Sequence, residues 1–311
     1  MSDARTLVKQ SVMTFDLPFM INLPDGPYEV TIENFHATVY ITRTRSPFNM
    51  AGLPQGVQFP ADAYVKGDRL GRFNYSKIII VFHHEIFIKP GIIFQDLLFL
   101  KSVEIVNTIL NVCRGVRGDH YVRINDSDIF SHNLKYVSPE GEEVSGGAFA
   151  IGGQMEIGTG GAYEPTPEEL SKIKAILSGN ATLPLWQSIL LDAYDNHFYR
   201  NYRMAIIEAG TAFEVFVYSF VRTGYLRLGK SEQDIETKLM APFKNLLCDH
   251  IKILTGNDFC KTAQYQNWND NSYEKRNQIV HRGTNATDVD SSTAVTIVGD
   301  TIRFLMSLNY L

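Results

Sequence analysis

Residues 201–224 read NYRMAIIEAGTAFEVFVYSFVRTG, the most apolar helical pattern in the chain. Apolar side chains recur along it at helical spacing, and we expect the helix to end at Gly224. A helix that is apolar on most of its surface must be covered by other helices. This segment therefore predicts a helical bundle.

The sequence on both sides of this segment supports a bundle. A Thr cap with early glutamates begins the predicted helix at 166–180, and Pro242 should break the helix predicted at 231–256. The further predicted helices are residues 166–180, 183–198, 231–256, about 270–282 and about 290–310. Because short loops join them, we expect an up-and-down bundle over residues 165–311.

The first half of the chain has a different pattern. Residues 13–26 and 28–45 are rich in β-branched and aromatic residues on either side of a Pro-Asp-Gly turn, and residues 76–88 form a strongly apolar run. These patterns predict strands, with more strand-like sequence up to about residue 150. One helix is expected at 94–115, ending at Gly115.

The glycine-rich stretch 146–165 is interpreted as a domain boundary. The sequence thus predicts an α+β protein. Its β-rich domain, residues 1–155, has an unknown role, with sensing or target binding as candidates. A helical bundle follows at residues 165–311.

Composition limits the class of protein. The formal net charge of −5 provides no global positive field for nucleic acid, although a local basic site is still compatible with it. Three widely spaced cysteines without a CxxC pair argue against a disulfide framework and against a zinc ribbon. The N-terminus does not look like a signal peptide, and there is no run of 18 apolar residues. We expect a reduced, cytoplasmic protein without a membrane span.

Residues 272–283, SYEKRNQIVHRG, are the strongest candidate for a functional site. On a helix, Asn277 and His281 share one face, and Arg276 lies at the edge of that face. Gly283 can cap the helix, which places His281 in the last turn, where a protonated imidazole is favoured.

These side chains suit chemistry on a phosphodiester. Arg276 can hold a phosphate and stabilise developing negative charge. His281 can transfer a proton to or from a hydroxyl group, and Asn277 can orient either partner. This chemistry needs no metal and no cofactor. The plainer interpretation is that basic residues in a last turn complement the helix dipole.

RNQIVH fits the R-N-x-x-x-H motif of the HEPN superfamily, and residues 185–310 resemble that family. The preceding helix resembles the family's earlier core helix, with Thr211-Ala212-Phe213-Glu214 as its "T-A-(apolar)-E" element. The N-terminal half resembles the β-rich segment that precedes some anti-phage HEPN domains of the Apea-like kind.

The resemblance implies a metal-independent endoribonuclease in an anti-phage defence or toxin setting. The 2′-hydroxyl would attack, and the products would carry 2′,3′-cyclic phosphate. Arg276 would stabilise the charge, His281 would handle the proton and Asn277 would position them. Glu214 would brace Arg276 or serve only in packing, and Glu208 is the competing candidate on the same helix.

The resemblance also implies partners. These are RNA, a second copy joined through the motif helices, and an antitoxin or a phage-derived trigger that restrains or releases the enzyme. The alternative is a non-catalytic HEPN dimerisation module whose N-terminal domain binds a protein or a small ligand.

Other patterns are weaker. His83-His84-Glu85 could begin a metal site, but the P-C-x-x-C partner of a zinc deaminase is absent. Asp126-Ser127-Asp128 has nucleotidyltransferase spacing but is better interpreted as a turn. Tyr273 could stack on a base, although helix packing is the more ordinary role.

Overall fold

The computed structural model describes residues 6–17, 19–33, 35–47, 72–88, 95–119, 121–129, 131–150 and 164–310. The chain forms two compact units, Met1–Thr182 and Leu183–Leu311. The first contains a β-sheet and the second is helical, so the predicted α+β class with a β-rich N-terminal half is confirmed.

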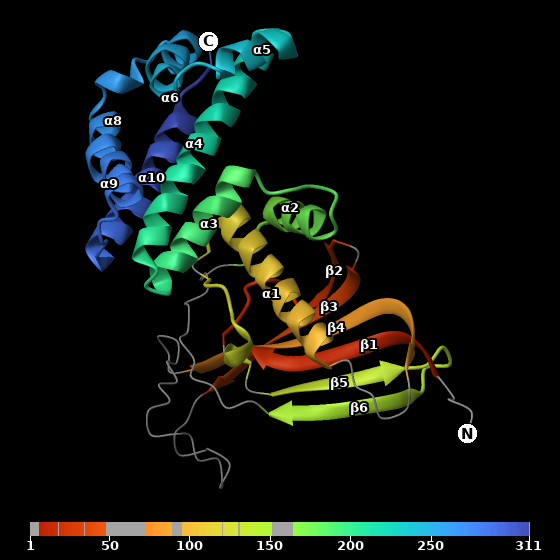
Figure 1. The fold of residues 1–311 in the computed structure, drawn as a ribbon. Helices are drawn as coiled ribbons and strands as arrows, with labels where there is room; N and C mark the ends of the chain where they lie inside the picture. Colours follow the sequence, from red (N-terminus) through yellow and green to blue (C-terminus); the bar gives the residue numbers. More distant parts are fainter. Residues whose placement is uncertain are drawn as a thin grey trace. The chain divides into compact units, whose positions relative to one another are not determined.

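The first unit is built on one antiparallel sheet with the strand order β2-β3-β4-β1-β5-β6 (Figure 1). Its strands are β1 (Thr6–Leu17), β2 (Gly26–Ile32), β3 (Phe35–Pro47), β4 (Arg72–Ile88), β5 (Ser131–Val137) and β6 (Glu143–Ala150). Apolar residues alternate along the central strands, with Ile78, Ile80 and Phe82 buried on one face.

Helix α1 (Gln95–Arg117) packs against the sheet, where Phe99 stacks on His132 of β5 at 4.3 Å between ring centroids. The predicted end at Gly115 is wrong by two residues. Gly118 is the residue that adopts the left-handed conformation, with a φ of 71°, and its N–H donates to the Arg114 carbonyl. That geometry closes the helix one turn later than the first glycine.

Helix α2 (Pro167–Leu177) begins with a reciprocal capping box between Thr166 and Glu169, as the sequence predicts. It belongs to the first unit, although the predicted boundary at 155–165 places it in the bundle. It packs on α1 and β2, and Lys174 lies over the Tyr28 ring at 5.7 Å. Much of the glycine-rich stretch 146–165 lies outside the described residues.

In the second unit, all regular elements of the described residues 183–310 are helices. They are α3 (Leu185–Phe198), α4 (Tyr202–Arg227), α5 (Glu232–Leu239), α6 (Phe243–Asn245), the π-helical turn η3 (Leu246–His250), α7 (Ile251–Thr255), η4 (Phe259–Lys261), α8 (Ala263–Trp268), the π-helical turn η5 (Asn269–Tyr273), α9 (Glu274–Arg282) and α10 (Asp288–Ser307). The break after α5 falls at Pro242, as predicted.

Helix α4 is the core of the second unit, with α3 and α10 packed along it (Figure 1). It continues to Arg227 rather than ending at Gly224. Gly224 is buried inside the helix, and a Cβ there would lie 2.7 Å from atoms of Leu254 and Tyr310. The glycine therefore permits close packing instead of ending the helix.

By length and composition alone, α4 could cross a membrane. However, 56% of its most apolar window is buried inside the unit. The core helix of a soluble protein has the same property.

Cys248 and Cys260 form a disulfide with a Cα–Cα distance of 5.2 Å, whereas the sequence predicts reduced cysteines. Sequence spacing could not reveal this pair, because the turn between α7 and η4 brings together two residues 12 positions apart. Cys113 is a buried free thiol in the first unit, and burial raises its pKa to about 12.

Candidate functional site

The motif Arg276-Asn277-His281 lies on α9, a short helix that ends at Gly283. Gly283 adopts the left-handed conformation with a φ of 65°, and its N–H donates to the Ile279 carbonyl. The predicted helix and its glycine cap are therefore confirmed, and His281 lies in the last turn. The helical run begins earlier than expected, because α8 and η5 lead directly into α9.

Arg276 points toward α4. Its Nη1 lies 3.0 Å from Glu214 Oε1, and its Nη2 donates to Oε2 at 3.4 Å. The two side chains are 23% and 32% exposed, so the ion pair lies at the rim of the core and solvent still reaches it. Of the two proposed carboxylates, Glu214 is the partner of Arg276.

Gly210 gives the Arg276 side chain its space. A Cβ at Gly210 would lie 2.5 Å from Arg276 Cδ and 3.1 Å from Nε. Gly210 and Glu214 are one turn apart on α4, so together they form a slot and an acceptor for one guanidinium. The Nε of Arg276 is buried without a hydrogen-bond partner, so the Glu214 carboxylate supplies the contacts.

Glu208, the competing carboxylate, has a different partner. Asn196 of α3 donates to Glu208 Oε2 at 2.7 Å. Burial raises the pKa of Glu208, and the amide of Asn196 opposes that shift. Since Glu208 and Glu214 are six residues apart, they lie on different faces of α4.

Helix α9 runs antiparallel to α4. Arg276 contacts Gly210 and Glu214, whereas Ile279 packs against Ile206 one turn nearer the start of α4. The last turn of α9 therefore lies beside the first turn of α4.

A second ion pair fixes α9 to α10, since Lys275 Nζ lies 2.8 Å from Asp290 Oδ1. The Lys275 ammonium and then the Thr287 backbone N–H lower the pKa of Asp290 to about 2. Sequence reasoning missed this contact, although the Thr287–Asp290 capping box marks the start of α10.

His281 is exposed and Asn277 is half-buried. At about 100° per residue, His281 lies about 140° around the helix from Arg276, whereas Asn277 lies one turn before His281 on its own side. The structure thus places all the candidate residues on α9 and α4, with a direct contact between Arg276 and Glu214. A phosphate that bridges Arg276 and His281 would have to span the solvent-exposed edge of α9.

The structure also brings together Ser291, His197 and Asp288, a combination that sequence reasoning missed. His197 Nδ1 lies 3.1 Å from Ser291 Oγ, and His197 Nε2 lies 4.0 Å from Asp288 Oδ1. Ser291 is fully buried, so its hydroxyl cannot reach a substrate. This cluster joins α3 to α10 and is not a nucleophilic triad.

The weaker candidates have structural contacts. His83 Nε2 bonds to Thr38 Oγ1 and His84 Nε2 to Ser11 Oγ, each at 2.8 Å, while the Glu85 side chain lies outside the described residues. Asp126–Asp128 forms a 3-10 turn. Tyr273 packs on Trp268. Among the described residues, no group of three or more His, Cys, Asp or Glu side chains could hold a metal ion.

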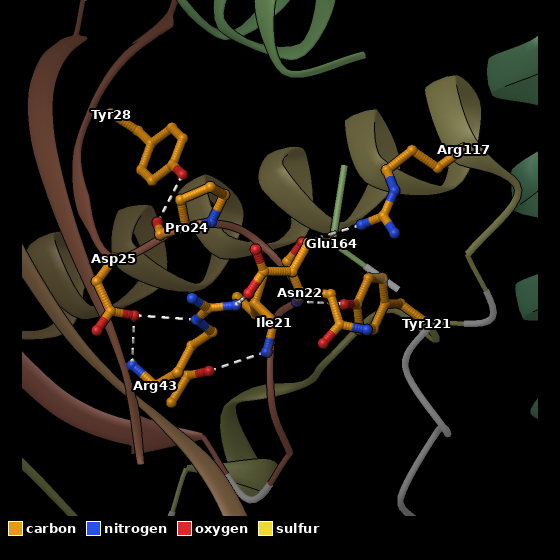
Figure 2. Close-up of polar contacts among 10 residues, drawn as sticks. Ile21, Asn22, Pro24, Asp25, Tyr28, Arg43, Arg117, Tyr121 and Glu164 are labelled. Carbon is orange, nitrogen blue, oxygen red and sulfur yellow. Dashed lines mark hydrogen bonds and ion pairs between the residues drawn. The ribbon is translucent and has the colours of Figure 1, made fainter. Parts of the chain in front are cut away.

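The first unit has a network of polar contacts around the segment between β1 and β2 (Figure 2). Arg43 bonds to Asp25 and Glu164, at 3.0 and 2.8 Å. The backbone of Asn22 donates to the Tyr121 hydroxyl and accepts from Arg117. The contacts of Asn22 satisfy the backbone of the segment between β1 and β2, and those of Arg43 pair its charge with two carboxylates, so both have a structural role.

No family model, curated protein or solved structure is significantly similar to this chain. The geometry of α4, α9 and α10 and the motif itself are therefore the basis for assigning a function.

Proposed function

We propose that the protein is a metal-independent endoribonuclease of the HEPN type, acting in anti-phage defence or as a toxin. The observation that carries the proposal is the slot on α4. Gly210 and Glu214 hold the guanidinium of Arg276 at a solvent-accessible rim, on the same short helix as the exposed His281. An arginine held in one orientation is suited to stabilising charge on a phosphate.

In the proposed reaction, the 2′-oxygen of RNA forms a bond to phosphorus as the bond from phosphorus to the 5′-oxygen breaks. His281 transfers the proton between these oxygens and solvent, because an imidazole can do so near neutral pH. Arg276 stabilises the charge on the non-bridging oxygens. Asn277 orients the imidazole from the preceding turn. Glu214 is a positioning residue that acts through Arg276.

We further propose that two copies pair through their motif helices. Val280 on α9 and Val289 on α10 are 51% and 71% exposed, and a second copy would remove these apolar side chains from water. An antitoxin or a phage-derived trigger would act on this dimer, with the first unit as the sensing part.

Because the proposed substrate is RNA, we place the protein in the cytoplasm. The reducing conditions there would favour free thiols at Cys248 and Cys260 over the disulfide.

The second candidate is a non-catalytic dimerisation module, which the Arg276–Glu214 ion pair favours. A guanidinium that is already paired can be a structural part of the α4–α9 contact. In this case the first unit would bind a protein or a small ligand, and α9 would serve only in association.

The test is cleavage of RNA by the purified full-length protein in EDTA. Arg276→Ala and His281→Ala should each lower the cleavage rate at least about a hundredfold. The matched controls are Arg222→Ala, which removes an ion-paired arginine outside the motif, and His36→Ala, which removes an exposed histidine. Equal rates from all five proteins would reject the ribonuclease and favour the module.

A further inference from the structure

One end of the helical unit carries basic side chains without acidic partners. Within the described part of the chain, no ion pair involves Arg200, Arg203, His281 or Arg282, and all four residues are exposed. The chain as a whole is acidic, with a net charge of −5. This group of basic side chains is therefore a local feature of an acidic chain. We call the four residues Arg200, Arg203, His281 and Arg282 the basic end.

Two elements meet at the basic end. Ile206, Gly210 and Glu214 lie on the stripe of α4 that contacts α9. Arg203 is one turn before Ile206 on that stripe, so it lies beside the last turn of α9. Arg200 precedes it in the turn between α3 and α4.

Two acidic side chains near the basic end have partners other than its arginines, and a third is exposed. Asp290 is paired with Lys275, and Glu208 accepts from Asn196. Asp288 is 69% exposed and lies 4.0 Å from His197. Among the described residues, none of these three carboxylates forms an ion pair with Arg200, Arg203 or Arg282.

We propose that the basic end binds the phosphate backbone of single-stranded RNA, with Arg200 and Arg203 contacting phosphates that flank the scissile one. This inference rests on the proposed function and adds residues that hold the substrate without taking part in the chemistry. Arginine suits this role because its planar group donates two parallel hydrogen bonds to a phosphate. Such contacts position the strand and carry no sequence information.

The experiment compares RNA binding by full-length variants, all made with His281→Ala so that the RNA remains intact. The probe is a fluorescein-labelled single-stranded RNA of mixed sequence, and the readout is anisotropy at salt concentrations from about 50 to 200 mM. Arg200→Gln with Arg203→Gln should raise Kd about tenfold. It should also lower the slope of log Kd against log salt by about 1.4, or about 0.7 per lost phosphate contact.

The matched control is Lys230→Gln with Lys244→Gln, which removes two exposed charges from the same unit. Lys230 follows the C-terminal end of α4, opposite the basic end. This pair should leave Kd and the salt slope unchanged. Equal Kd values and slopes for the test pair and the control pair would overturn the inference.

Arg200→Gly guards against a folding defect. Arg200 has a φ of 63°, a conformation that glycine adopts without steric strain, so this variant should fold at least as well while Kd rises several-fold. A cleavage assay with His281 restored separates the two proposals. Cleavage by the wild type with an unchanged KM in the Arg200/Arg203 variant overturns only the basic end. If the wild type binds RNA without cleaving it, and the Arg200/Arg203 variant no longer binds, the result supports the basic end and rejects the ribonuclease.

Discussion

Arg276 is held by two residues of α4 that have different roles. Glu214 supplies the carboxylate and Gly210 supplies the space. The sequence predicted Glu214 as a partner through its place in the TAFE element, but it left Glu208 open. It gave no indication of Gly210, because the register between two helices depends on packing across the whole unit.

Glu214→Gln tests the bracing role. It removes the charge but keeps the shape, so the free energy of unfolding should fall by about 1 kcal/mol for this rim ion pair. Because the guanidinium loses its orientation, kcat for RNA cleavage should fall about tenfold or more while KM stays the same. Glu232→Gln, which disrupts the surface pair with Arg222, is the control. A loss of stability with unchanged kcat would assign Glu214 to packing alone.

Gly210→Ala tests the slot. Glycine to alanine inside a helix normally stabilises a protein by about 0.5–1 kcal/mol. Here the new methyl group would overlap Arg276 Cδ, so we expect the free energy of unfolding to fall and the cleavage rate to fall with it. Denaturant unfolding and the cleavage assay check both results. A normal gain in stability would contradict the close approach of these side chains.

At the scale of the helix, glycine was an imperfect stop signal. Gly283 and Gly256 end α9 and α7 in the left-handed conformation. Gly224 lies inside α4, where Leu254 and Tyr310 pack too closely to leave room for a side chain. The glycines in the sequence indicate where a helix can end, whereas tertiary packing determines which of these glycines does end one.

The disulfide between Cys248 and Cys260 joins η3 to η4 across α7. Closing a loop of this length should raise the free energy of unfolding by up to about 3 kcal/mol. Cys248→Ser should therefore lower the denaturation midpoint to that of the reduced wild type.

Mass spectrometry after alkylation in denaturant checks the bond itself. Without a reductant, one cysteine, Cys113, should react, and after reduction all three should react. Alkylation of three cysteines without a reductant would show that the purified protein lacks this bond.

For the molecule as a whole, the α+β class followed from two different apolar periodicities, one for each half of the chain. The strand order did not follow, because β1 lies between β4 and β5 although the nearest strand in sequence is β2. The boundary was also misplaced, since α2 has a helical pattern but packs on α1 and β2. Long-range pairing depends on the complete surfaces of the elements, which one local pattern does not contain.

Three histidines, one buried and two half-buried, give the stability of the protein a dependence on pH. Burial lowers the pKa values of His132, His84 and His250, with the charge of His83 adding to the shift at His84 and that of Lys238 at His250. Below about pH 6.5, the unfolded chain binds protons at these sites that the folded chain does not bind. Stability should therefore be fully present above that pH and decrease as the pH falls toward 5.5.

Denaturant unfolding at several values between pH 7.5 and pH 5.5 measures this slope, above the range where carboxylates such as Asp290 take up protons. His132→Gln should make the slope shallower, although it also removes a ring that stacks on Phe99. An unchanged slope in His132→Gln would contradict this explanation. So would a wild-type protein that is more stable at pH 5.5 than at pH 7.5.

The chemical identity of the RNA ends tests the central claim most directly. The full-length protein would cut a defined RNA in EDTA, and mass spectrometry would identify both new termini. Attack by the 2′-hydroxyl predicts a 2′,3′-cyclic phosphate on one fragment and a 5′-hydroxyl on the other. A 2′-deoxy substitution at the cleaved nucleotide, or His281→Ala, should abolish both products. Fragments with 3′-hydroxyl and 5′-phosphate ends, or products that persist in His281→Ala, would contradict the assignment of Arg276 and His281 as the catalytic residues.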